Sequence, residues 1–239
     1  MTRPILVACA HGTSNPEGKA AILGVVEEIR AARPDLTVLD AYVDVHGPEL
    51  PEVVAGLPTE APAVVVPLLL SVGYHVKVDI GRAVKSRERT TAAAPLGPDP
   101  RLAQVLAARL AQTGLGPDDA VVLAAAGSSN PAAADDVERL ADMLRHLIPN
   151  RILPAYGASA EPSVPAAVAE LRAEEVSRIV VASYLLAPGY FHDQLAKAGA
   201  DAVAPPLLPA PEVARIAVDR FDAALEALKS GGDWPGQGS

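Results

Sequence analysis

Four short stretches of this chain each occur twice, in the same order and at nearly constant spacing. The first copies cover residues 10–16, 41–51, 67–75 and 94–106, and the second copies cover residues 125–131, 155–165, 183–191 and 205–217. Offsets of 111 to 116 residues at all four stations indicate an internal duplication rather than chance matches in an Ala- and Pro-rich chain. We therefore predict two similar halves, residues 1–115 and 116–230, followed by a Gly-rich tail, 231–239, that we expect to be disordered.

Each half alternates short β-branched runs with longer stretches of helical periodicity. The predicted strands are 4–9, 37–44, 63–70 and 91–95 in the first half and 120–125, 151–156, 177–185 and 201–204 in the second. The predicted helices are 17–32, 48–56, 77–89 and 100–113, then 132–147, 163–174, 189–198 and 211–229. This alternation indicates an α/β fold in which each half is a doubly wound parallel sheet with helices on both faces. We expect the two halves to face a central cleft.

Composition narrows the choice of partners. The formal net charge of −9 argues against nucleic acid or an anionic membrane as the main partner, because both call for basic stripes. The single cysteine, Cys9, excludes an intrachain disulfide and is expected to be a small buried hydrophobe. No apolar run is long enough for a signal peptide or a membrane-spanning helix, so we expect a cytoplasmic protein. The chain also has no P-loop and no GxGxxG, and we expect no nucleotide cofactor.

Three side chains able to bind a metal lie at or just after the carboxyl ends of predicted strands of the first half. They are His11, Asp44 and His75, and the repeat pairs them with Ala126, Ala158 and Phe191. The carboxyl ends of parallel strands meet at one edge of a sheet, where open α/β sheets bind their ligands. Two imidazoles and a carboxylate without a thiolate suit a divalent cation such as cobalt, iron, nickel or zinc. The alternative for His11 is a histidine that only ends a strand and bonds a backbone carbonyl.

Several other residues near these strand ends are weaker candidates. His46 is either an extra ligand or a loop residue before the Gly47-Pro48 turn. His192 follows the position equivalent to His75, where contact with a substrate is possible. The turn formed by residues 12–16 either binds a carboxylate through backbone amides or begins a helix with Ser14 or Asn15 as its N-cap. Tyr74 and Tyr190 either contact a ligand or fill the cleft.

A basic segment follows His75 directly. It contains Lys77, Arg82, Lys85, Arg87 and Arg89 against Asp79 and Glu88, a net charge of +3 in an acidic protein. Such cations could attract a polyanionic ligand to the candidate site. The alternative is a solvated helix face with i,i+4 spacing, as between Lys85 and Arg89.

The chain resembles the sirohydrochlorin chelatases, ATP-independent enzymes that insert cobalt or ferrous iron into a tetrapyrrole, in their two-half form. The resemblance rests on AHGTS at 10–14, AYVDVHGPELPE at 41–52, VVVPLLLSVGYHVKVDI at 64–80 and PLGPDPRLAQVLAARL at 95–110. It implies that His11 and His75 are the catalytic, metal-binding pair and that the second strand supplies a carboxylate. Asp44 holds the position where the family more usually has Glu, and Gly81 stands where Pro is common.

The resemblance also implies the chain's function. The metal, Co²⁺ or Fe²⁺, would be a substrate, and the product would serve siroheme or cobalamin synthesis. Sirohydrochlorin carries carboxylates around a flat ring, so we expect Gly12, Thr13, Ser14, Tyr74, Lys77, Arg82, Lys85 and His192 to contact it. The first half would carry the active site, the second would be a degenerate repeat, and the protein would be a monomer or a homodimer.

Two other functions remain open from the sequence. A carrier of tetrapyrrole or metal would use the same ligands without turnover. A phosphatase with His11 as its nucleophile is the second alternative, but histidine phosphatases need an arginine directly before that histidine, and this chain has Ala10.

Overall fold

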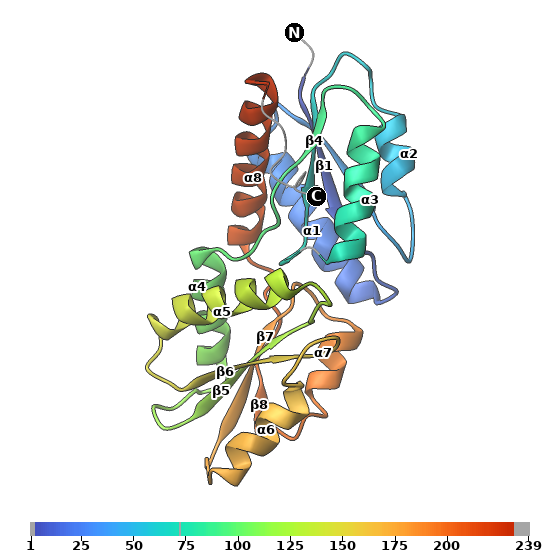
Figure 1. The fold of residues 1–239 in the computed structure, drawn as a ribbon. Helices are drawn as coiled ribbons and strands as arrows, with labels where there is room; N and C mark the ends of the chain where they lie inside the picture. The colour runs from blue at the N-terminus through green and yellow to red at the C-terminus, as the bar shows by residue number, and fades with distance from the viewer. Residues whose placement is uncertain (1–2, 72, 232–239) are drawn as a thin grey trace. The chain divides into compact units, whose positions relative to one another are not determined.

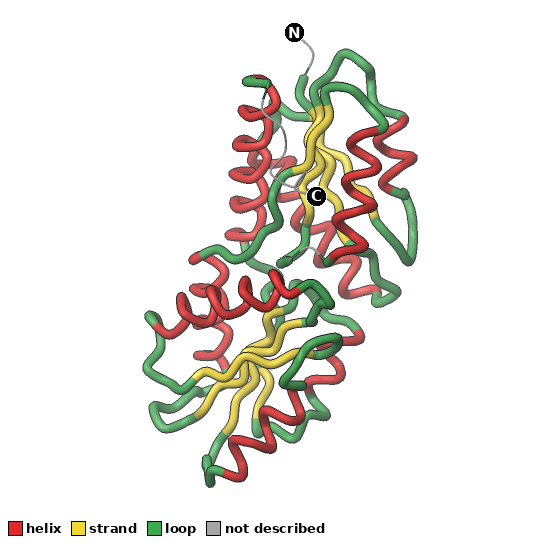
Figure 2. The backbone as a smooth tube through the Cα atoms, viewed as in Figure 1, coloured by secondary structure: helices red, strands yellow, loops and turns green. Residues whose placement is uncertain are grey.

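The computed structural model describes residues 3–71 and 73–231, without the side chains of residues 74–76 (Figure 1). Its elements divide into two compact units. One unit contains residues up to Leu96 together with the segment from Pro211 onward, and the other contains Gly97–Ala210. Each unit has one sheet of four parallel strands between layers of helices, as the repeat predicts (Figure 2).

The first unit is built on the strand order β2-β1-β3-β4. Its strands are β1 (Ile5–Ala10), β2 (Thr37–Tyr42), β3 (Ala63–Pro67) and β4 (Thr90–Ala92), and its helices are α1 (Pro16–Ala32), α2 (Leu50–Ala55), α3 (Tyr74–Lys85) and α8 (Pro211–Lys229). Helices α1 and α8 cover one face, and α2 and α3 cover the other (Figure 1). Alternate residues of β1, namely Ile5, Val7 and Cys9, are buried in the core beneath α2 and α3.

The second unit repeats this topology with the strand order β6-β5-β7-β8. Its strands are β5 (Ala120–Ala125), β6 (Ile152–Tyr156), β7 (Ile179–Tyr184) and β8 (Ala202–Val203), and its helices are α4 (Pro100–Gln112), α5 (Pro131–Arg145), α6 (Val164–Ala173) and α7 (Tyr190–Leu195). Helices α4 and α5 lie on one face, with α6 and α7 on the other (Figure 1).

The compact units differ from the predicted halves because two helices are exchanged. Helix α4 belongs to the first sequence repeat but packs against α5 and β7, whereas α8 packs against α1, β3 and β4. Each exchanged helix is fixed by an equivalent arginine. Arg109 of α4 donates to the carbonyl oxygens of Leu207 (2.9 Å) and Pro209 (2.7 Å).

Arg220 of α8 donates in the same way to the carbonyl oxygens of Pro95 (3.0 Å) and Leu96 (3.3 Å). The sequence duplication therefore places the boundary between the two repeats at residue 115, whereas the chain passes from one compact unit to the other at residues 97 and 211.

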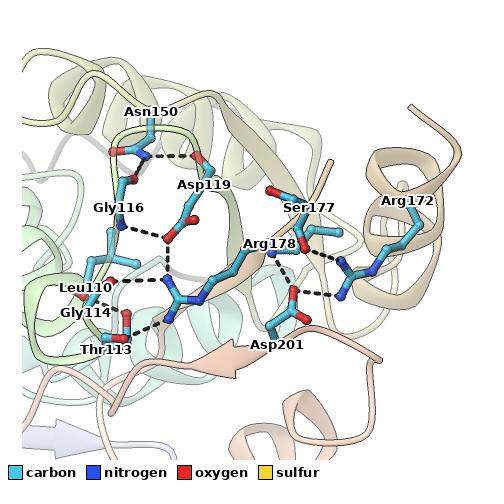
Figure 3. A network of polar contacts seen from close by, with 11 residues as sticks. Leu110, Thr113, Gly114, Gly116, Asp119, Asn150, Arg172, Ser177, Arg178 and Asp201 are labelled. Carbon is cyan, nitrogen blue, oxygen red and sulfur yellow. Dashed lines mark hydrogen bonds and ion pairs between the residues drawn. The ribbon is translucent and has the colours of Figure 1, made fainter. Parts of the chain in front are cut away.

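A polar network holds the chain after α4 against the amino ends of the second sheet's strands (Figure 3). Asp119 accepts hydrogen bonds from the backbone N–H of Gly116 (2.7 Å) and from Arg178. Arg178 also donates to the carbonyl oxygen of Thr113 (2.8 Å), and Asn150 donates to that of Gly116 (2.8 Å). All these groups are satisfied within the second unit, so this network is structural.

Two element boundaries depart from the prediction in ways that affect the candidate residues. Strand β2 ends at Tyr42 instead of residue 44, because the Tyr42 N–H donates to the Pro48 carbonyl oxygen and the chain turns away from the sheet. Helix α3 covers 74–85 instead of 77–89. It ends where the Ser86 hydroxyl donates to the Ala83 carbonyl oxygen at 2.7 Å. In the described part of the chain, no helix combines the length and apolar character needed to cross a bilayer.

Candidate functional site

His11 and Asp44 lie together at the carboxyl edge of the first sheet, on loops that are bonded to each other. His11 follows β1 directly, and the N–H of Asp44 donates to its carbonyl oxygen at 2.9 Å. The N–H of Val43 makes the corresponding bond to Ala10 at 3.0 Å. Both His11 and Asp44 are exposed. The backbone thus fixes the two loops while both side chains face solvent.

Gly12 makes this close approach possible. Its φ is +100°, a conformation that other residues rarely adopt, and a Cβ atom there would lie 2.1 Å from the Asp44 carbonyl oxygen. Beyond it, the Thr13 hydroxyl accepts from the N–H of Asn15 (3.1 Å), and the Asn15 side chain accepts from the N–H of Gly18 (2.9 Å). Asn15 is therefore the N-cap of α1, while Ser14 remains exposed.

Asp44 begins a tight turn in which one oxygen of its carboxylate is already engaged. Its Oδ1 accepts from the N–H of Val45 at 2.6 Å, and Val45 has a φ of +70°. Its carbonyl oxygen accepts from the N–H of His46 at 2.9 Å. This leaves Oδ2 as the oxygen of Asp44 suited to a cation.

His46 is a loop residue, because β2 does not continue to it. Its ring lies 4.0 Å from the ring of Tyr42, centroid to centroid, and Nδ1 lies 3.0 Å from the Gly47 carbonyl oxygen. A carbonyl only accepts, so Nδ1 carries the proton. Nε2 is buried without a hydrogen-bond partner among the residues that the structure describes.

Tyr74 and His75 lie in the first turn of α3, which follows β3 at this same edge, but their side chains are outside the described part of the structure. The backbone therefore brings the His75 position to the sheet edge of His11 and Asp44. Among the described side chains, no three His, Cys, Asp or Glu residues form a metal-binding group.

The basic segment is divided by the helix. Lys77 is exposed in the first turn of α3, near the carboxyl edge. Arg82 and Lys85 are in the last turn, about 8 and 12 Å farther along the axis at 1.5 Å per residue. Arg82 lies 3.8 Å from Asp79, and both side chains are exposed. Of the cations in the basic segment, only Lys77 lies near the carboxyl edge that carries His11 and Asp44.

Arg87 and Arg89 are at the opposite edge of the first sheet. Arg87 donates to the carbonyl oxygens of Pro58 and Ala61 and to the Thr90 hydroxyl, so it closes the turn before β4. Arg89 lies outside α3 with a φ of +55°. The alternative of one solvated helix face with i,i+4 spacing therefore does not extend from Lys85 to Arg89, because the helix ends between them.

The second sheet repeats the first site's backbone without its ligands. The N–H of Ala158 donates to the Ala126 carbonyl oxygen at 3.0 Å, in the positions of Asp44 and His11. Gly127 has a φ of +92°, and a Cβ atom on it would lie 1.7 Å from the Ala158 carbonyl oxygen. The equivalent of Val45, Ser159, also has a positive φ, +59°.

The remaining histidines and Cys9 occupy different settings. His192 is partly buried in α7, and its Nε2 has no partner among the described residues. His146 caps α5, with Nδ1 2.6 Å from the Asp142 carbonyl oxygen. Cys9 is fully buried, and burial raises the pKa of its thiol to about 12. It therefore stays a neutral core residue, as predicted.

Comparison with known proteins shows clear relatives. The CbiX family matches residues 5–113 and 120–224. A sirohydrochlorin ferrochelatase of Bacillus subtilis is 29% identical over 139 residues, which are 55% of this chain and 53% of that protein, so the match spans about half the length of this curated relative.

Solved structures match over nearly the whole chain. SirB from Bacillus subtilis with Fe³⁺ has a TM-score of 0.81 at 18% identity, covering 97% of this chain and 99% of that one. SirB from Bacillus subtilis subspecies spizizenii in complex with cobalt has a TM-score of 0.77 at 17% identity, covering 96% and 98%. A CbiX from denitrifying bacteria has a TM-score of 0.67 at 20% identity, covering 93% and 99%. These likenesses establish the shared two-sheet fold.

Proposed function

The chain belongs to the CbiX family of sirohydrochlorin chelatases, and from this premise we propose that it inserts divalent iron or cobalt into sirohydrochlorin. The observation that supports this most is the exposed His11 at the end of β1, bonded through its backbone to the loop of Asp44. The same loops in the second unit carry Ala126 and Ala158. The ligand-type side chains are thus an addition to a backbone that folds without them.

His11 and His75 are the proposed catalytic pair, with Asp44 as an additional metal ligand. Insertion requires partial dehydration of the metal and removal of two pyrrole protons from the ring. A neutral imidazole can bind the metal, and an imidazole nitrogen can also accept a proton. Two or three protein ligands hold the ion less tightly than a closed structural site, so it can leave for the ring.

The proposed substrate contacts begin at the carboxyl edge of the first sheet. Backbone and hydroxyl groups of Gly12, Thr13 and Ser14 begin the loop beside His11, and Lys77 offers an ammonium group for a substrate carboxylate. We propose that Arg82 and Lys85 act through their long-range field, because the last turn of α3 keeps them from this edge. Tyr74 and His192 complete the proposed contacts.

An absorbance assay of the purified protein with sirohydrochlorin and either Fe²⁺ or Co²⁺, without nucleotide, tests this function. Insertion above the uncatalysed rate, with many turnovers per protein molecule, supports a chelatase. Stoichiometric binding of tetrapyrrole or metal without turnover would instead show a carrier. Competition between the two metals in one reaction measures the preference that separates siroheme from cobalamin synthesis.

A further inference from the structure

Two aromatic rings are exposed side by side at the start of α7. Tyr190 is 72% exposed and Phe191 39%, and their ring centroids lie 5.7 Å apart in an edge-to-face arrangement. The other aromatic side chains that the structure describes are buried, namely Tyr42, Tyr156, Tyr184 and Phe221. An exposed apolar pair in a chain with only 3% aromatic residues marks a contact surface rather than a leftover of the core.

This aromatic pair lies at the carboxyl edge of the second sheet. Helix α7 follows β7, and Phe191 occupies the position that the repeat pairs with His75. A Cβ atom on Gly157 would come within 3.1 Å of Cδ1 of Phe191, so the ring lies against the loop after β6. Glycine at residue 157, where the first half has Val43, leaves room for it.

A polar group without a partner lies in the same turn. Nε2 of His192 is buried and has no hydrogen-bond partner among the described residues. A buried polar nitrogen left unpaired is costly, which favours a ligand that supplies the missing partner. The exposed aromatic pair, together with the unpaired Nε2 of His192, suits the uncharged face of a planar ring that carries polar atoms.

We propose that Tyr190 and Phe191 are a stacking surface for the flat face of the tetrapyrrole, with Nε2 of His192 bonded to a polar group of the same molecule. The identity of the ligand rests on the proposed function. Aromatic stacking contributes through ring contact and desolvation, so added salt does not weaken it by screening as it weakens charge pairs.

The test measures the binding of metal-free sirohydrochlorin to the whole 239-residue chain by the change in absorbance. Tyr190→Ala combined with Phe191→Ala should weaken binding about tenfold, equally at low and high ionic strength. Tyr190→Phe should keep nearly the full affinity. Leu147→Ala is the matched control, because Leu147 is also an exposed apolar residue of the second unit, at 47%.

Cobalt binding without tetrapyrrole should be unchanged in the double variant. Unchanged affinity for sirohydrochlorin would overturn the proposal, as would a defect that disappears at high salt or a parallel loss of cobalt binding. A wild-type protein that binds sirohydrochlorin through these rings but never inserts metal would refute the chelatase function and support the stacking surface.

Discussion

The carboxyl edges of the two sheets have almost the same backbone and different side chains. In both, the loop after the central strand contains a glycine with positive φ that lies against a carbonyl of the neighbouring loop. In both, one N–H of that neighbouring loop donates to the residue before the glycine. That residue is His11 in the first unit and Ala126 in the second. The comparison shows that the loops are fixed by backbone geometry, which leaves the side chains free to differ in function.

The amino edges also differ in their side chains. The second unit has the network around Asp119 and Arg178, and the duplication places Pro4 and Pro62 at these positions of the first unit. The first unit instead uses Arg87 at its amino edge, where this side chain donates to the carbonyl oxygens of Pro58 and Ala61. Polar side chains therefore serve structure at both amino edges and, in our proposal, chemistry at the carboxyl edge of the first sheet.

The largest expected effect is on the rate of metal insertion, and it tests whether the carboxyl edge of the first sheet carries the chemistry. His11→Ala should lower the rate of metal insertion by at least about a thousandfold, since it removes both a metal ligand and a proton acceptor. His146→Ala is the control, because that histidine only caps a helix. The measurement is turnover by absorbance, with thermal unfolding to confirm an intact fold. Near-normal turnover in His11→Ala would refute the site assignment.

The two equivalent glycines after β1 and β5, Gly12 and Gly127, should be equally important for stability. Gly12→Ala and Gly127→Ala each force a Cβ atom into a backbone carbonyl, and each should cost about 3 kcal/mol in free energy of unfolding. Urea denaturation of both variants measures the cost. Gly24→Ala is a suitable control, since a Cβ atom there meets nothing within 4 Å. A cost confined to Gly12→Ala would mean that the two loops are not equivalent.

Loosening the exchanged helices α4 and α8 should lower stability by a smaller amount, and by a similar amount in each unit. Arg109→Ala and Arg220→Ala each remove two hydrogen bonds to backbone carbonyls, and each should destabilise its own unit by about 1–3 kcal/mol. Hydrogen exchange can assign the loss to residues of one unit. Arg215→Ala serves as the control, because its side chain is largely exposed. Loss of protection in the wrong unit would contradict the exchange.

The smallest effect concerns charge. Lys77→Gln should raise the KM for sirohydrochlorin a few-fold at low salt and less at high salt, because the lost attraction is screened. Arg82→Gln with Lys85→Gln should change KM less, as both lie in the last turn of α3. Steady-state kinetics at several ionic strengths test this order. A larger effect from the distant pair would place the substrate along the whole helix.

The sequence predicted the sheets well because the duplication supplied the same pattern twice. Strand β5 and helix α8 have the predicted bounds, and His11 lies at the end of β1 as expected. The exchange of α4 and α8 was not predictable, because the apolar face of a helix does not reveal which of two similar sheets it covers. The early end of α3 depends on a hydroxyl cap at Ser86, a local signal too weak to stand out in a basic, helix-favouring segment.

The position of α8 has a consequence for the order in which the protein is made. The strands that lead into His11 and Asp44 are synthesised early, but the helix covering β3 and β4 comes more than a hundred residues later. The second unit, which is continuous from residue 97 to 210, has all its parts before that helix leaves the ribosome. The unit begun first is therefore completed last, and its proposed metal chemistry becomes available only after translation has passed through the whole second unit.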